Sequence, residues 1–128
     1  MTANSTRSRK NKGQRLQKEI VQTLRKKFGF DSKEQLNDFE GNITANPMGM
    51  AGIDIRLSPL AQETIPFDIE SKNQEKLNIW SAIQQAEDNS KEGRIPLLVF
   101  SRNRSKTYAV LEFDKLLELL GGVNEKTE

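Results

Sequence analysis

The chain has 128 residues, of which 30% are charged and 34% hydrophobic, so it is long enough for one domain with one hydrophobic core. It contains no cysteine and no histidine, which excludes disulfides, thiolate or imidazole metal sites, and every catalytic site that depends on a histidine base. Any metal ion must then bind through oxygen, which favours Mg²⁺ or Mn²⁺.

Basic residues are concentrated at the N-terminus. Residues 1–27 hold nine lysines and arginines and one acid, a net charge of +8, whereas the rest of the chain carries −6. A basic segment on a mildly acidic body suggests a polyanionic partner such as DNA, although a solubilising tail has the same composition. We find no apolar run long enough to span a membrane and no secretory signal. The absence of cysteine fits a reducing setting, so we expect an intracellular protein.

The predicted elements begin with a polar, basic arm over residues 1–12, which we expect to be disordered. Apolar residues at every fourth position then predict a helix over residues 14–28, ended by Gly29. Residues 31–42 are polar and acidic, and predict at most a turn or a short helix. The cations of the N-terminal arm and of the start of the first helix are candidate phosphate contacts: Arg7, Arg9, Lys10, Lys12 and Arg15.

Two strands are predicted in the middle of the chain. Residues 43–52 contain Asn-Pro and two glycines, and therefore predict a loop. Alternating apolar and polar residues predict strands over residues 53–57 and 65–70, with residues 58–64 as the loop between them. If the two strands pair as a hairpin, their polar side chains can converge on one site.

The C-terminal part predicts a helix, two strands and a last helix. Apolar residues about three apart predict a helix over residues 75–89, and a continuous apolar run predicts a buried strand over residues 95–100. A strand over residues 107–111 and a helix over residues 113–120 follow, with a disordered tail over residues 122–128. The basic turn between the strands offers three more phosphate contacts: Arg102, Arg104 and Lys106.

This order of elements predicts a single α/β domain over residues 13–121. We expect three layers, with a small mixed central β-sheet flanked by helices.

Three side chains on the predicted strand pair suit phosphodiester hydrolysis. Asp54 lies in the first strand, and Glu70 and Lys72 share one face at the end of the second, since side chains two apart point the same way. The two carboxylates and the backbone carbonyl of Ser71 offer oxygen ligands to a divalent metal, and Lys72 could hold the attacking water or a phosphate oxygen. An acid-x-Lys triplet alone is weak evidence, and residues 31–33 form a second one outside any strand pattern. The combination with Asp54 is what indicates a nuclease.

These motifs resemble the PD-(D/E)XK nuclease superfamily, with its restriction-endonuclease-like fold. More narrowly, they are similar to phage-encoded proteins related to archaeal-type Holliday junction resolvases. The resemblance covers roughly residues 12–120 and rests mainly on residues 48–55 and 66–74. Ile53 stands where a proline usually precedes the aspartate, which is a mild departure because the carboxylate of Asp54 is kept.

The resemblance implies a Mg²⁺-dependent DNA endonuclease, commonly a homodimer, that cuts four-way junctions and uses no small-molecule cofactor. It implies that Asp54 and Glu70 are metal ligands and that Lys72 is the catalytic lysine. Gln85 matches a glutamine near the active site of such nucleases, although a solvent-facing helical residue is an equal alternative.

The first helix departs from the archaeal pattern. Archaeal resolvases often offer a glutamate to the metal from this helix, whereas the matching position here is Gln17, with Glu19 two residues later. Residues two apart on a helix differ by about 200°, so the two cannot share a role. We expect Gln17 to lie near the metal and Glu19 to face solvent, with Glu19 as the ligand if the alignment slips.

Two other functions stay open on the sequence alone. A nuclease of the same fold can act on other DNA, as a nickase or as a repair or packaging nuclease. The chain can also be a catalytically silent DNA-binding module, although the intact Asp54, Glu70 and Lys72 argue against this alternative.

Overall fold

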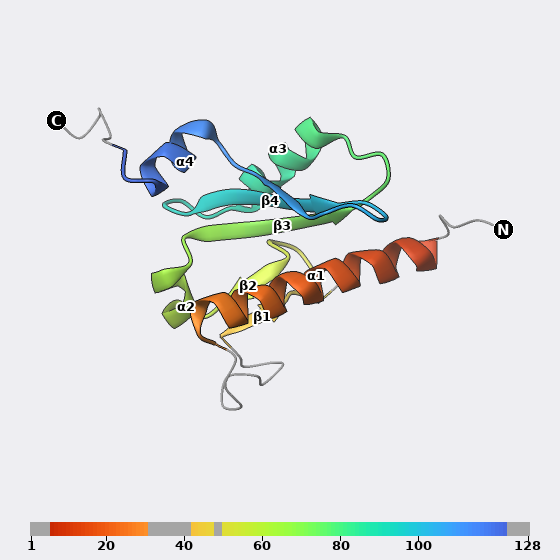
Figure 1. The fold of residues 1–128 in the computed structure, drawn as a ribbon, viewed down its shortest axis with the longest axis horizontal. Coiled ribbons are helices and arrows are strands. Elements are labelled where there is room, and N and C mark those ends of the chain that lie inside the picture. Colours follow the sequence, from red (N-terminus) through yellow and green to blue (C-terminus); the bar gives the residue numbers. More distant parts are fainter. Residues whose placement is uncertain (1–5, 31–41, 48–49, 123–128) are drawn as a thin grey trace.

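In a computed structural model of the chain, helices and strands alternate from end to end, as in an α/β protein (Figure 1). The structure describes residues 6–30, 42–47 and 50–122. In this part of the chain the elements are α1 (Thr6–Phe28), β1 (Ile43–Ala45), β2 (Ile55–Leu57), α2 (Pro59–Thr64), β3 (Phe67–Asn73), α3 (Ile79–Asn89), β4 (Ile95–Ser101), β5 (Tyr108–Val110) and α4 (Phe113–Leu119).

The strands form two small sheets. The first contains β1 and β2, which are antiparallel; the second has the order β3-β4-β5, with β3 and β4 parallel and β5 antiparallel to β4. In Figure 1, β3 and β4 run between α1 on one side and α3 on the other, and both helices contact β3. The α/β class and the mixed pairing of strands are therefore confirmed.

The two strands predicted over residues 53–57 and 65–70 do not pair as a hairpin. β2 pairs with β1, a segment that we had predicted to be a loop, and α2 occupies the connection to β3. The reason is local, because the side chain of Ser58 accepts a hydrogen bond from the Ala61 N–H and Pro59 occupies the first turn of α2. β1 in turn buries Ile43 completely, and the side chain of Arg25 donates to its carbonyl at 2.8 Å.

The first helix begins earlier than the sequence indicates. Residues 6–12 were expected in a disordered arm but are helical, and residues 1–5 lie outside the described residues. Asn73 Nδ2 donates to the carbonyl of Lys12 at 3.2 Å, so the helix is attached to the end of β3 at this point. A helix that is already held by tertiary contacts extends at little cost, which explains the additional N-terminal turns. The expected turn at residues 31–42 and the tail from residue 123 fall almost entirely outside the described residues.

The core lies between α1 and the strands. Its most buried side chains include Leu16 from α1, Ile43 and Ile55 from the first sheet, and Ile69 from β3. These apolar contacts stabilise α1 against β3, and this packing places the N-terminal half of α1 beside the carboxyl end of β3. In the residues that the structure describes, no helix has the length and apolar character needed to cross a bilayer.

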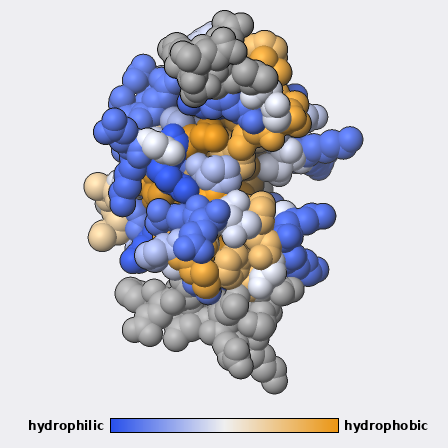
Figure 2. Space-filling view, turned by 90° about the vertical axis from the view of Figure 1, so that its left-hand side faces the viewer, coloured by the Kyte–Doolittle hydropathy of each residue, from blue (hydrophilic) through white to orange (hydrophobic). Residues whose placement is uncertain are grey.

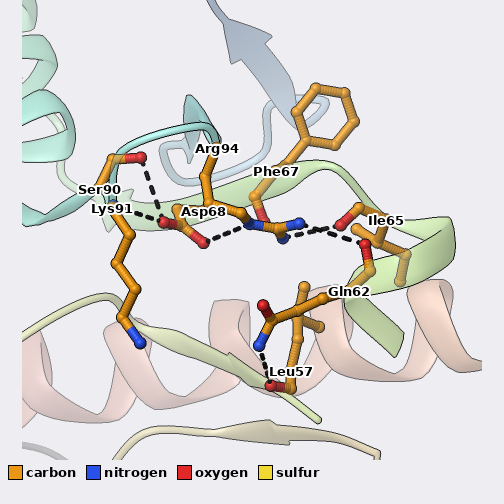
Figure 3. A network of polar contacts seen from close by, with 8 residues as sticks. All are labelled: Leu57, Gln62, Ile65, Phe67, Asp68, Ser90, Lys91 and Arg94. Carbon is orange, nitrogen blue, oxygen red and sulfur yellow. Dashed lines mark hydrogen bonds and ion pairs between the residues drawn. The ribbon is translucent and has the colours of Figure 1, made fainter. Parts of the chain in front are cut away.

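A buried ion pair connects β3 to the segment that follows α3 (Figure 3). Arg94 Nε lies 3.2 Å from Asp68 Oδ1, and the same guanidinium donates to the carbonyls of Ile65 and Phe67 at 2.7 and 2.8 Å. Asp68 Oδ2 accepts from the Lys91 N–H at 2.9 Å. Because both charges have several partners, the network holds the C-terminal end of α3 against β3.

Candidate active site

Asp54 lies between the two sheets and is held from both sides. Its N–H donates to the carbonyl of Ile69 in β3 at 3.0 Å, and its carbonyl accepts from the N–H of Asn46 at 2.7 Å. The Asp54 side chain reaches β3 as well, because Oδ2 accepts from the Ser71 N–H at 2.7 Å. The carboxylate is therefore positioned by backbone groups and not by a flexible loop alone.

Glu70 is the other carboxyl group at this site, and it is 1% exposed. Asn89 Nδ2, from the last residue of α3, donates to Glu70 Oε1 at 2.9 Å. Burial raises the pKa of Glu70 from 4.5 to about 7; the hydrogen bond from Asn89 and the charge of Lys72 lower this pKa, whereas the neighbouring Asp54 raises it. Two carboxyl groups thus lie close together in a place that disfavours negative charge.

A cleft of about 690 Å³ opens beside Asp54, between α1 and the end of β3, and Glu70 is not among the described residues that line it. Asp54, Ser71 and Lys72 line one part of it. The N-terminal half of α1 contributes Gln17 together with Arg9, Lys12 and Gly13. The catalytic cleft, as we call it, therefore combines a carboxylate with several cations, which suits a phosphodiester substrate.

The chain matches, over residues 8–127, the model of a family described as "Phage putative PDDEXK endonuclease". The chain belongs to this family. The match covers nearly the whole sequence, so the chain is a phage endonuclease of the PD-(D/E)XK type, a hydrolase, and its α/β fold is consistent with that type. No curated protein matches the chain, and no solved structure does.

Endonucleases of the PD-(D/E)XK type generally use a divalent metal, and the donor set of this endonuclease fits one. No group of three or more Asp and Glu side chains suited to a metal occurs within the described residues, so a metal held by Asp54 and Glu70 would need further oxygen ligands. Ser71 can supply one, because the N–H and C=O of a strand residue point to the same side and its N–H faces Asp54. Two carboxylates and carbonyl or phosphate oxygens are the hard ligands that Mg²⁺ prefers.

The other predicted site residues of the endonuclease are found in different places. Gln17 is 6% exposed and lines the same cleft as Asp54, whereas Glu19 is exposed, as expected for the solvent side of α1. Gln85 is exposed on α3, and Asn89, one turn later, is the residue of α3 that contacts Glu70. Asn89 was not among the predicted site residues, although its spacing of four from Gln85 places the two on one helix face.

The predicted phosphate contacts of the endonuclease do not form one group. Arg9 and Lys12 line the catalytic cleft, Arg7 and Arg15 line a different cleft, and Lys10 is exposed. The remaining three lie in the exposed β4–β5 turn: Arg102, Arg104 and Lys106.

Proposed function

We propose that this endonuclease hydrolyses DNA phosphodiesters in the catalytic cleft and that its substrate is the four-way (Holliday) junction. The observation that carries the proposal is the meeting of Asp54 and Glu70 beside Lys72. The Ser71 N–H binds the carboxylate of Asp54, and the Asn89 amide binds the carboxyl group of Glu70. The segment before β2, strand β3 and helix α3 therefore all contribute to one site.

Each side chain has a role in this proposal. Asp54, Glu70 and the carbonyl of Ser71 would hold Mg²⁺ or Mn²⁺, which supplies Lewis acidity and lowers the pKa of water when bound. Lys72 orients the attacking water or a phosphate oxygen and offsets the negative charge that develops during hydrolysis. Gln17 faces the same cleft and would contact the metal through a water molecule.

DNA contacts come from the cations around the site. Arg9 and Lys12 lie in the catalytic cleft, where they would neutralise the phosphates next to the scissile one. Arg102 borders a neighbouring cleft of about 490 Å³, and Glu75 and Lys76 line both this cleft and the catalytic cleft. The exposed β4–β5 turn therefore lies where DNA leaving the site can reach it, and we propose the same role for Arg104, Lys106 and Lys10.

The junction substrate calls for a homodimer. A four-way junction has approximate two-fold symmetry and needs two similar cuts, whereas one chain offers one Asp54/Glu70/Lys72 set. α4 has no buried residue and exposes much of its apolar surface, with Phe113 at 69%, and the adjoining C-cap residue Leu120 is 76% exposed. Figure 2 shows the end of the molecule that carries α4, where hydrophobic patches lie exposed at the upper right and again in the middle and lower part of the view. A second copy would cover this surface.

The layers in Figure 1 also support the restriction-endonuclease-like, three-layer architecture that we propose for this domain. In this arrangement the site lies at the end of β3, on rigid elements, as accurate catalysis requires.

The proposal is tested by cleavage of a synthetic four-way junction and of a linear duplex of the same arm sequence, each with and without Mg²⁺. We expect paired, metal-dependent cuts in the junction, and far slower cutting of the duplex. Equal cutting of both would indicate a nickase, repair or packaging nuclease. Binding without cutting of either would indicate a DNA-binding module instead.

A further inference from the structure

The N-terminal half of α1 lies between two clefts. One is the catalytic cleft; the other, of about 910 Å³, lies between α1 and the segment that follows β1. Gln17 and Pro47 line both clefts and therefore mark the boundary between them. We call the second one the outer cleft, and its described lining includes Arg7, Asn11, Gln14, Arg15, Lys18 and Asn46.

The outer cleft has the chemistry of a polyanion site. Among the described residues that line it, Arg7, Arg15 and Lys18 are cationic and none is acidic. None of the three cations forms an ion pair with a described residue. The Asn46 amide already donates to the carbonyls of Ala51 and Ile53, so the amides that can donate to a ligand here are those of Asn11, Gln14 and Gln17. Unpaired cations with amide donors suit phosphates and nucleobase edges.

The dimensions of the cleft suit a strand of nucleic acid. Arg7, Asn11, Gln14 and Lys18 follow one another at spacings of four, three and four, so they share one face of α1. This row extends over about 16 Å, which equals the axial rise of about five nucleotides in one DNA strand. It starts beside the catalytic cleft, so a single substrate can occupy both clefts.

We propose that the outer cleft binds a second segment of the same DNA that is cut in the catalytic cleft, with the two segments diverging across Gln17 and Pro47. α1 would then lie at the branch of the substrate and select DNA in which two segments separate. This inference rests on the proposed function, because it takes the catalytic cleft to be the site of cutting.

The test compares two double variants of the full chain. Arg15→Ala/Lys18→Ala removes two exposed cations of the outer cleft, and Lys26→Ala/Lys27→Ala removes two exposed cations from the far end of the same helix. Fluorescence anisotropy in EDTA measures binding to a labelled fork or four-way junction and to a linear duplex that shares one arm.

We expect only the outer-cleft variant to lose affinity, and only for branched DNA. Two lost phosphate contacts lower the log–log salt slope by about 2, so the affinity ratio of wild type to variant should change about tenfold between about 50 and 200 mM salt. Linear duplex binding should change less than about twofold.

Three outcomes overturn the inference. Equal losses on branched and linear DNA would make the outer cleft part of one continuous duplex track. An equal loss of affinity in the Lys26/Lys27 variant would mean that only the net charge of the protein matters. No loss of affinity for any DNA would mean that the outer cleft does not bind DNA, and its charge would then favour an acidic protein as the partner. Failure of the proposed function looks different, because the wild type would then show no Asp54-dependent cleavage with Mg²⁺ whether or not the outer cleft binds DNA.

Discussion

Asn89 Nδ2 donates a hydrogen bond of 2.9 Å to Oε1 of Glu70, and this contact joins the last residue of α3 to the buried carboxyl group of β3. The end of α3 is itself held by Asp68, which accepts from the Lys91 N–H and pairs with Arg94. The orientation of Glu70 therefore depends on a helix that carries none of the three proposed catalytic groups.

This contact makes Asn89 a positioning residue in the proposed site. Asn89→Ala removes the donor that orients Glu70, and a loss of this kind commonly costs about 10- to 100-fold in metal affinity or activity. We expect cleavage rates to fall by that factor and the Mg²⁺ concentration for half-maximal rate to rise, while DNA binding in EDTA is unchanged. Gln84→Ala, an exposed change on the same helix, is the matched control and should behave as wild type. An unchanged Mg²⁺ requirement in Asn89→Ala would remove Asn89 from this role.

The three central groups are predicted to act in cleavage and not in binding. Asp54→Asn, Glu70→Gln and Lys72→Ala should each lower the cleavage rate by on the order of 10²-fold or more, because they remove stabilisation of the transition state. Binding of uncleaved DNA in EDTA should remain within a few-fold of wild type. The other acid-x-Lys triplet gives a control, since Asp31→Asn and Lys33→Ala should keep full activity. Near-normal turnover in any of the first three variants would exclude that residue.

Much of the fold was predictable because helix and strand periodicity is local. The apolar run at residues 95–100 forms β4, and the spacing of apolar residues located α3. This helix begins only at Ile79, because the side chain of Asn78 accepts from the Ser81 N–H and caps its N-terminus. Strand pairing was not predictable, since it depends on partners far apart in sequence. β2 pairs with residues 43–45, which carry too short a pattern to indicate a strand by themselves.

The catalytic side chains of the proposed site were predictable from the sequence, but the residues that position them were not. The Glu70-Ser71-Lys72 triplet and Asp54 were predicted from residue types and spacing, and the structure brings Asp54 to Ser71 although the two strands do not form a hairpin. The role of Asn89 could not be read, because the angle at which α3 packs on β3 decides which of its polar side chains meets Glu70. Tertiary packing of this kind leaves no periodic signal in the sequence.

The raised pKa of Glu70 predicts a pH-dependent stability in the metal-free protein. With a pKa of about 7 in the folded state against 4.5 ordinarily, the protonated form stabilises the fold fully below about pH 4.5, and this contribution is lost as the pH rises to about 7. Urea unfolding in EDTA should therefore show that Glu70→Gln gains stability relative to wild type between about pH 5 and 8, by at most about 3 kcal/mol.

Added metal supplies the control for this titration. Mg²⁺ should stabilise wild type at about pH 8 much more than it stabilises Glu70→Gln, because binding to the ionised carboxylate offsets its burial. A difference between wild type and Glu70→Gln that stays constant with pH would contradict the assignment of Glu70 as the titrating group.

The last prediction concerns assembly, and it follows from the exposed apolar surface of α4. If a second copy covers this helix, sedimentation at micromolar concentration should give about twice the chain mass of 14.6 kDa. Phe113→Asp/Leu120→Asp places two charges on the most exposed apolar residues of α4 and its C-cap, and should yield a monomer that is folded, since neither side chain is buried. Leu60→Asp, an equally drastic change at a residue of α2 that is 54% exposed, should remain dimeric.

The cleavage products then report what the dimer contributes. A monomer retains Asp54, Glu70 and Lys72, so it should nick a four-way junction but rarely make the two cuts that resolve it. A mixed dimer with one Glu70→Gln subunit should behave in the same way, because one of its two sites is inactive. A monomeric variant that still makes paired cuts would contradict the need for a two-fold assembly and would favour the more general nuclease. Nicking by both species, with resolution only by the intact dimer, would link the apolar face of α4 to the choice of a branched substrate.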